Sequence, residues 1–288
     1  EFIPSTAFPG DTVKMRYTLA NLSTSDAATN TTFTDNLNAA LTGLAGRNLP
    51  TTNPCGFTLS GATSLDAADG TLAPGSSCTF EVDVLIPSSA TVGTYVSASS
   101  SLSAEVDGGN IAIDPASTTL EIASPIVFSK QFTDDPTSPG DTVTLEYTVT
   151  NISTAYELTD IGFTDDLSSV LSGLVATDLP QTAIIGAGST LSGTSLITLT
   201  GGTLAADSSQ TFSVTLQVPS DTAPGVEHSS ASSAASATHN GTAVSGDAAS
   251  DTLSVTPGLH LTKEFLGESI AGGSVTVRYT LTNPNTNV

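Results

Sequence analysis

Short stretches in which apolar and polar residues alternate run through the whole chain. Apolar side chains occupy every second position in residues 13–19, 143–149 and 275–281. A period of two places these side chains on one face of an extended strand. No long stretch has apolar residues at helical spacing. Residues 35–44 and 165–174 predict one short helical turn each, with Asp35 and Asp165 as the capping residues.

The alternating strand returns at a fixed interval, preceded each time by a similar turn. The motif Pro-Gly-Asp-Thr-Val stands at residues 9–13 and 139–143, and a looser version, Ala-Gly-Gly-Ser-Val, at 271–275. Phe-Thr-Asp follows in the first two copies, at residues 33–35 and 163–165. Such a period indicates tandem copies of one domain. The expected domains are 1–124, with an incomplete first strand, 125–256, and 257–288, which holds the first two strands of a third copy.

The fold class predicted from this pattern is all-β, with tandem Ig-like β-sandwich domains of about seven to eight strands each. The Ser/Ala-rich stretches 97–104 and 229–236 occupy equivalent positions in the two copies, which favours strands of small residues over flexible linkers. The turns at 107–110 and 239–242 are rich in Gly and Asn, as tight hairpins require.

The net charge of the chain limits the kinds of molecule that it can bind. The chain has 28 acidic and 6 basic residues, a formal net charge of −22. This balance argues against binding to nucleic acid and to anionic lipid surfaces. No apolar run is long enough to cross a bilayer, so no membrane insertion is expected within this segment. The expected partners are other copies of the chain or neighbouring repeats.

Two cysteines, Cys55 and Cys78, lie in the first copy, where the second copy has Ile185 and Gln210. Their joint absence from the second copy is what a disulfide bond predicts; two buried free thiols are the alternative. A loop of this length would contribute about 3 kcal/mol in the chain-entropy model.

Four asparagines begin N-glycosylation triplets, and these candidate sites are Asn21, Asn30, Asn151 and Asn240. Such triplets arise easily by chance in a chain rich in Ser and Thr. Asn21 and Asn151 also end the alternating strands, so a structural role at the turn competes with glycosylation there.

Calcium is the one metal that the acidic residues suggest. The candidate ligands are Asp134 and Asp135 near the junction of the copies, and the repeated Asp35 and Asp165. The alternative is that the repeated Asp35 and Asp165 cap a helical turn or a strand end, as the repeated Asp11 and Asp141 serve turns. No EF-hand loop is present. No other cofactor is expected.

No catalytic residues are predicted, and the chain is not expected to be an enzyme. The sequence has no nucleophile elbow, phosphate loop or zinc motif. Lys130 and Lys263 stand at equivalent positions on the first strand of their copies. The last strands offer no asparagine, so an internal isopeptide bond is not expected.

The motifs together resemble a family of Ig-like tandem repeats in bacterial and archaeal extracellular surface proteins. They read Ser-Lys-Gln-Phe at 129–132, Val-Thr-Asn at 149–151, Phe-Thr-Asp-Asp-Leu at 163–167, and Thr-Leu-Ala-Pro-Gly-Ser-Ser-Cys-Thr-Phe at 71–80. The resemblance covers essentially the whole chain. The second copy lacks the cysteine pair of the pattern, so the disulfide is not obligatory. The resemblance implies a structural extracellular role.

The predicted function is therefore that of a structural extracellular repeat protein, forming a stalk, sheath or filament on or outside a prokaryotic cell. One alternative is a self-assembling fibre subunit linked by donor-strand exchange through residues 258–288. Another is the spacer region of a surface adhesin. The expected location is extracellular or at the cell surface.

Overall fold

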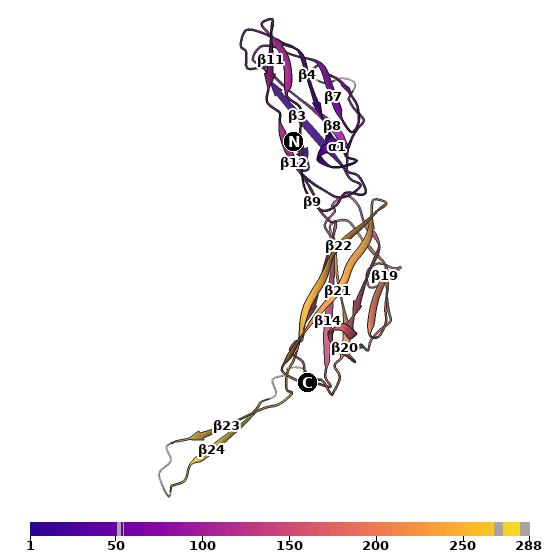
Figure 1. Cartoon of the computed structure of the whole chain (residues 1–288). Coiled ribbons are helices and arrows are strands. Elements are labelled where there is room, and N and C mark those ends of the chain that lie inside the picture. Colours follow the sequence, from indigo (N-terminus) through magenta and orange to yellow (C-terminus); the bar gives the residue numbers. More distant parts are fainter. Residues whose placement is uncertain (51–52, 54, 268–272, 283–288) are drawn as a thin grey trace. The chain divides into compact units, whose positions relative to one another are not determined.

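The computed structural model describes residues 1–50, 53, 55–267 and 273–282 (Figure 1). The chain divides into two compact units. Unit one comprises Glu1–Pro125 with the short segment His239–Val244, and unit two comprises Ile126–Thr238 and Ser245–Val288. Both units are built of β-strands with one helical turn each, so the fold is all-β, a tandem of Ig-like sandwiches.

Unit one is a sandwich of short strands. Its elements are β1 (Phe2–Ile3), β2 (Thr6–Ala7), β3 (Thr12–Ala20), β4 (Ala28–Asp35), α1 (Leu37–Ala40), β5 (Ala45–Arg47), β6 (Thr58–Ser60), β7 (Leu65–Leu72), β8 (Ser77–Leu85), β9 (Gly93–Ala98), β10 (Leu102–Val106), β11 (Gly109–Ile113) and β12 (Ser117–Ile122). Its described strands form sheets of order β1-β3-β8-β5, β11-β10-β4-β7-β6 and β2-β12-β9. The inward side chains of these sheets share one core, which includes Met15, Phe33 and Val82.

Unit two repeats this plan with longer strands. Its elements are β13 (Ile126–Phe132), β14 (Thr142–Asn151), β15 (Leu158–Asp166), α2 (Leu167–Val170), β16 (Val175–Ala176), β17 (Gln181–Thr182), β18 (Thr190–Ser192), β19 (Leu196–Leu204), β20 (Ser208–Gln217), β21 (Val226–His239) and β22 (Thr242–Val255). The sheets have the orders β13-β14-β20-β16 and β17-β18-β19-β15-β21-β22. The Ser/Ala-rich stretch lies in β21, so it is a strand, as predicted.

Aromatic rings fill the space between the sheets at the same place in each unit. In unit two, the ring of Phe163 lies 4.5 Å from that of Phe128 and 5.0 Å from that of Tyr147. In unit one, the ring of Tyr17 lies 5.1 Å from that of Phe80. Tyr17 and Tyr147 are therefore core residues, as their place in the alternating strands predicts.

The two helical turns follow β4 and β15 as expected, but their capping residues differ from the prediction. The side chain of Asn36 accepts a hydrogen bond from the backbone N–H of Ala39. In unit two the side chain of Asp166 accepts one from Ser168. The predicted caps, Asp35 and Asp165, instead point into the core, because each stands at an inward position of its strand.

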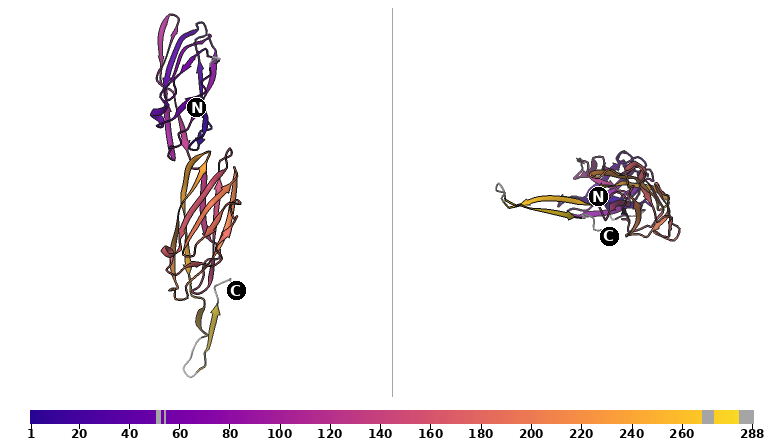
Figure 2. Two further views of the ribbon diagram at one scale, coloured as in Figure 1. Left: turned by 90° about the vertical axis from the view of Figure 1, so that its right-hand side faces the viewer. Right: turned by 90° about the horizontal axis from the view of Figure 1, so that it is seen from below.

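The segment predicted to begin a third copy contains a pair of strands, β23 (His260–Leu266) and β24 (Thr276–Thr282). They form a two-stranded antiparallel sheet (Figure 2). Leu261 and Phe265 on β23 are 63% and 62% exposed, and Tyr279 on β24 is 61% exposed. Residues 268–272 and 283–288 of the predicted domain 257–288 lie outside the described residues.

Candidate functional site

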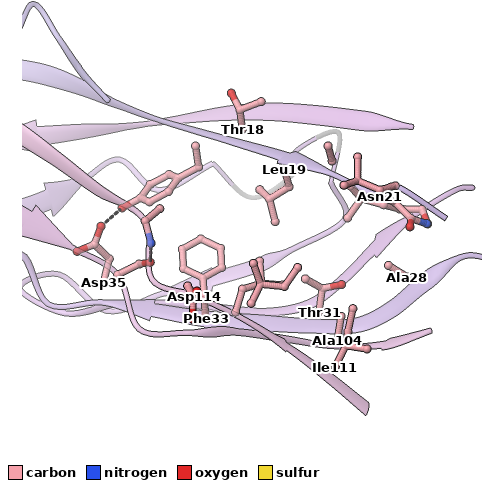
Figure 3. A pocket seen from close by; sticks show the side chains of 18 of the residues that line it. Thr18, Leu19, Asn21, Ala28, Thr31, Phe33, Asp35, Ala104, Ile111 and Asp114 are labelled. Carbon is pink, nitrogen blue, oxygen red and sulfur yellow. Dashed lines mark hydrogen bonds between the residues drawn. The ribbon is translucent and has the colours of Figure 1, made fainter. Parts of the chain in front are cut away.

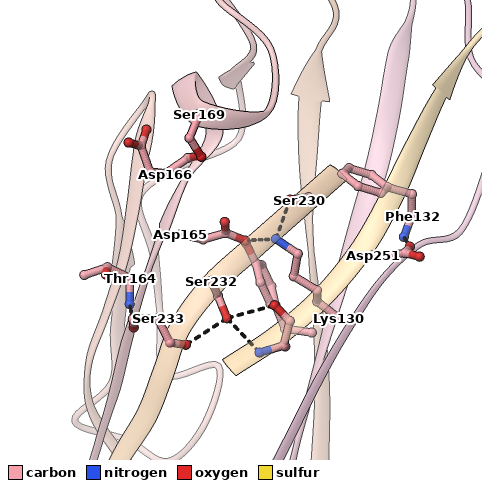
Figure 4. A network of polar contacts seen from close by, with 12 residues as sticks. Lys130, Phe132, Thr164, Asp165, Asp166, Ser169, Ser230, Ser232, Ser233 and Asp251 are labelled. Atoms are coloured by element: carbon pink, nitrogen blue, oxygen red, sulfur yellow. Dashed lines mark hydrogen bonds and ion pairs between the residues drawn. The ribbon is translucent and has the colours of Figure 1, made fainter. Parts of the chain in front are cut away.

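A buried ion pair occupies the interior of unit two (Figure 4). The Nζ atom of Lys130 on β13 lies 2.6 Å from Oδ2 of Asp165 on β15, and both side chains are 0% exposed. The same ammonium group donates a hydrogen bond of 2.5 Å to Oγ of Ser230 on β21. The hydroxyl of Tyr147 on β14 donates to Asp165 Oδ2 at 2.8 Å. Four strands from both sheets therefore meet in one network around this ion pair.

The strand period explains why a lysine lies in this core. Residues alternate between buried and exposed along β13, and Lys130 stands between the inward side chains of Phe128 and Phe132. A buried ammonium group is costly unless a counter-charge and hydrogen-bond acceptors satisfy it. Asp165 and Ser230 supply both.

Burial sets the protonation behaviour of this network. Burial lowers the pKa of Lys130, and the nearby charge of Asp165 acts in the opposite direction. Burial, together with the charge of Asp165, raises the pKa of Tyr147 far above its ordinary value. Tyr147 therefore remains a hydrogen-bond donor over the whole ordinary pH range.

Unit one contains the same arrangement without the lysine. The hydroxyl of Tyr17 donates to Oδ2 of Asp35 at 2.8 Å, and Oγ of Ser97 donates to Oδ1 at 3.2 Å. Burial raises the pKa of Asp35, while these two hydrogen bonds act to lower it. Within the described part of the chain, no lysine or arginine forms an ion pair with Asp35.

An open cavity of about 720 Å³ lies beside Asp35 (Figure 3). It lies along the inward face of β3, and its lining includes Tyr17 and Leu19. Both of these side chains are only half-buried, whereas their counterparts in unit two, Tyr147 and Val149, are 0% exposed. In unit two, β13 pairs with β14 opposite Tyr147 and Val149, whereas in unit one β1 pairs with β3 at Lys14 and Met15.

Asp134 and Asp135, two of the predicted calcium ligands, accept hydrogen bonds from other groups of the protein. Asp134 accepts hydrogen bonds from the backbone N–H and the hydroxyl of Thr144, at 2.6 and 3.1 Å. Asp135 accepts one from the backbone N–H of Ser254 at 2.7 Å. These carboxylates therefore bind backbone and hydroxyl groups near strand ends.

The two other calcium candidates lie apart from each other. Asp35 belongs to the interior of unit one and Asp165 to the interior of unit two. Over the described ranges, no group of three or more His, Cys, Asp or Glu residues is arranged to hold a metal ion. The calcium prediction therefore has no support in the structure.

Cys55 and Cys78 form a disulfide bond, with their Cα atoms 5.5 Å apart, and this prediction is confirmed. The bond joins the segment after β5 to the beginning of β8. In unit two the position of Cys55 is taken by Ile185, which is 1% exposed. An apolar side chain thus fills the core there in place of the sulfur.

Two of the four predicted glycosylation sites have buried side chains with a structural role. Asn21 and Asn151 are 8% and 0% exposed. The side-chain amide of each donates to three backbone carbonyls: those of Asp26, Leu72 and Ala73 for Asn21, and those of Tyr156, Leu204 and Ala205 for Asn151. A glycan would occupy the same nitrogen. Asn30 and Asn240 are exposed, and glycosylation there stays a prediction.

The serines of the two networks could not be predicted from the sequence. Ser97, which donates to Asp35, and Ser230, which accepts from Lys130, come from the Ser/Ala-rich strands, where many serines share one composition and nothing marks the inward ones. The repeated tyrosine of β3 and β14 and the repeated Phe-Thr-Asp motif were the available signals. In unit two, these groups pair a lysine with an aspartate and connect the two sheets.

No helix in the described part of the chain is long and apolar enough to cross a membrane.

Comparison with known proteins gives a family but no close relative of known role. No functionally curated protein matches the chain. Among solved structures, BcpA, the major pilin subunit of Bacillus cereus, is 11% identical with a TM-score of 0.37, over 87% of this chain and 71% of that one. A variant of the same pilin is 11% identical with a TM-score of 0.39, over 94% and 83%.

A mutant of Salmonella alpha-2-macroglobulin is 13% identical with a TM-score of 0.31. The match covers 91% of this chain but 16% of that protein, so this chain spans only a small part of its length. Similarity at these scores carries no functional argument. A family model, in contrast, matches residues 1–122 and again 125–255. The chain therefore belongs to the family described as "Domain of unknown function (DUF7933)", of which it holds two successive copies.

Proposed function

We propose that this chain is a load-bearing segment of an extracellular repeat protein, part of a stalk, sheath or filament at a prokaryotic cell surface. One observation carries the proposal: in each unit, a segment that follows the first strand runs parallel to the last strand and is hydrogen-bonded to it. This geometry resists a force applied along the chain.

The parallel contact is present in both units. In unit one, β2 pairs with β12 in parallel, with Thr6 opposite Glu121 and Ala7 opposite Ile122. In unit two, Thr137 and Val255 form a parallel bridge. There, Thr137 donates its N–H to the carbonyl of Ser254 at 3.0 Å, and also accepts from Thr256 at 2.8 Å.

A force that pulls the two ends of a unit apart acts on these two segments in opposite directions. Because they run parallel, the force slides one along the other, and all hydrogen bonds between them must yield together. Each backbone hydrogen bond between the two segments contributes only about 1 kcal/mol net to stability. Because the force loads all of these bonds at once, the paired segments resist being pulled apart.

In unit two, side chains add further hydrogen bonds between the beginning and the end of the unit. Asp251 on β22 accepts a hydrogen bond of 2.7 Å from the backbone N–H of Phe132, and Asp135 accepts one of 2.7 Å from that of Ser254. Gly246 allows close approach, since a Cβ at this position would lie 2.7 Å from the carbonyl oxygen of Ile126. The first and last strands of unit two are therefore joined along much of their length.

The extracellular location is supported by the disulfide bond, since such bonds persist in oxidising compartments. A surface made mainly of hydroxyl and small side chains with a net charge of −22 supports a soluble spacer that does not bind nucleic acid. No catalytic step enters the proposal. The recurring polar groups of both units are used to hold strands together.

Single-molecule stretching of the chain from its two ends tests this function. We expect a distinct high-force unfolding event for each unit, and a lower unfolding force for unit two in the variant Asp135→Ala/Asp251→Ala. Asp247→Ala is the matched control, because Asp247 is an exposed aspartate of β22. An unchanged unfolding force in the double variant, or gradual unfolding at low force in the parent chain, would refute a load-bearing role.

A further inference from the structure

An amine and a carboxyl group are held in contact inside unit two (Figure 4). The Nζ atom of Lys130 lies 2.6 Å from Oδ2 of Asp165, and both side chains are 0% exposed. The carboxyl carbon is one bond beyond this oxygen, so the nitrogen and the carbon are at most about 3.8 Å apart. Groups that react readily when held together have their reacting atoms about 3–3.5 Å apart. The two groups are therefore placed for the formation of an amide.

The two oxygens of the Asp165 carboxylate differ in their surroundings. Oδ2 accepts hydrogen bonds from Lys130 and, at 2.8 Å, from the hydroxyl of Tyr147. Oδ1 is also buried, and it has no hydrogen-bond partner among the described residues. By contrast, each carboxylate oxygen of Asp35 in unit one accepts a hydrogen bond. A buried oxygen without a partner is costly, above all when it carries part of a charge. The ion pair thus leaves one oxygen of Asp165 unsatisfied.

Burial favours an amide over the pair of ions. In water, an ammonium and a carboxylate stay separate because water solvates both charges. In a protein core this solvation is lost at a cost of several kcal/mol for each ion, whereas an amide has no net charge and needs only hydrogen-bond partners. Burial also lowers the pKa of Lys130, which makes the nucleophilic neutral amine more accessible than in water. The fold has already met the entropic cost of bringing the two groups together.

We propose that Lys130 and Asp165 condense to an internal amide bond, which joins β13 covalently to β15 in the opposite sheet. The sequence does not predict this bond, because the last strand of the copy has no asparagine. The structure brings a carboxyl group to the lysine from β15 instead. The inference goes beyond the load-bearing role and does not depend on it, since the bond can form whether or not the chain carries a force.

The reaction conserves atoms and charge. The lone pair of the Lys130 nitrogen forms a bond to the carboxyl carbon of Asp165, and the bond between this carbon and Oδ1 breaks. Two of the three ammonium protons leave with Oδ1 as one water molecule. The third proton stays on the amide nitrogen, and Oδ2 becomes the carbonyl oxygen. No oxidant or other reactant is needed. The ion pair is the state from which this reaction starts, and its own contribution to stability is measured on chain that has not yet condensed.

Tyr147 and Ser230 contact the two atoms that remain in the amide. The Tyr147 hydroxyl donates to Oδ2, where negative charge develops as the nitrogen adds to the carbon. It has the same acceptor when Oδ2 is the carbonyl oxygen. Oγ of Ser230 accepts from Nζ at 2.5 Å, which orients the nitrogen and leaves an acceptor for the amide N–H. Both polar atoms of the product therefore have a partner, and the oxygen that is released is the unsatisfied one.

Unit one contains an exposed ion pair that serves as the matched control. Lys14 donates a hydrogen bond to Asp83, and their side chains are 51% and 24% exposed. Water solvates both of these charges, so the separate ions are the stable state and contact alone gives no reason to condense. If burial drives the reaction, Lys130 and Asp165 react and Lys14 and Asp83 do not.

Mass spectrometry of the intact, denatured chain tests the proposal. We expect the parent chain, with its disulfide formed, to lack the mass of one water molecule. The variants Lys130→Met and Asp165→Ala should have their full mass, and the control Lys14→Met should lack one water as the parent does. A parent chain of full mass would overturn the proposal, and this result holds even if a variant fails to fold. A missing water that persists in Lys130→Met would overturn it as well.

Digestion and fragmentation of the parent chain locate the bond. A branched peptide that contains both Lys130 and Asp165 is expected, and a missing water located at any other residue would contradict the assignment. Tyr147→Phe tests the hydroxyl that contacts Oδ2: freshly made chain of this variant should lose water more slowly than the parent. Tyr17→Phe makes the same change in unit one and should leave the rate unchanged. Equal rates for the two variants would contradict the role assigned to Tyr147.

Single-molecule stretching gives a second readout of the bond. Lys130 and Asp165 are 35 residues apart along the chain, and the amide would keep the segment between them from extending. On unfolding, unit two of the parent should therefore lengthen by about 120 Å less than unit two of Lys130→Met, at about 3.4 Å per residue. This length reports the bond, whereas the unfolding force reports the load-bearing role, so either proposal can fail without the other. Equal lengths for the two chains would overturn the bond.

Discussion

The Nζ atom of Lys130 and Oδ2 of Asp165 lie 2.6 Å apart with both side chains fully buried. This contact joins the first strand of unit two to the opposite sheet. Two charges in such an environment depend on each other, because either one alone would be an uncompensated buried charge.

Lys130→Met should therefore destabilise unit two by about 3–5 kcal/mol, the usual cost of breaking a buried ion pair on one side. Chemical denaturation with probes in each unit would measure this, and the transition of unit one should not move. Adding Asp165→Asn to the same chain should recover much of the loss, because the remaining charge is removed. A lysine variant as stable as the parent would mean that the pair contributes nothing.

Loss of the disulfide should affect unit one alone. Cys55→Ala/Cys78→Ala is expected to lower its stability by about 3 kcal/mol, since the bond closes a loop in the unfolded chain. Unit two lacks cysteines and serves as the internal control. Thermal unfolding of the parent chain with and without reductant would give the same comparison. Equal effects on both units would contradict this assignment.

Asn151→Ala should destabilise unit two by about 2–3 kcal/mol, because three backbone carbonyl groups each lose a donor. Asn110→Ala, at an exposed position of β11, is the control and should change stability little. Glycosylation gives a second test: a glycan attached at Asn151 of folded protein, seen by mass spectrometry, would contradict the role assigned to its side chain.

The alternating strands were readable from the sequence because a period of two is a one-dimensional property. Residues 13–19 and 143–149 form the inner strands β3 and β14, with their tyrosines inward. The roles of Asp35 and Asp165 were not readable. Whether the aspartate or the next residue caps the helical turn depends on the register of one residue, and the register is fixed by packing.

The recurring asparagines show the same limit. Asn21 and Asn151 were visible as strand-ending residues, but the carbonyls that they bind include those of Leu72 and Leu204, more than 50 residues away in the chain. The sequence triplet around each asparagine does not reveal these partners. Only the packing against the neighbouring strand shows that the side-chain amide already donates hydrogen bonds to backbone carbonyls.

By itself, the sequence determined the all-β class, the tandem repeat and the paired cysteines, because repetition and joint loss are properties of the chain's order. The tertiary structure decided which charges meet. Lys130, Asp165 and Ser230 are separated along the chain and come together only when two sheets close over one core.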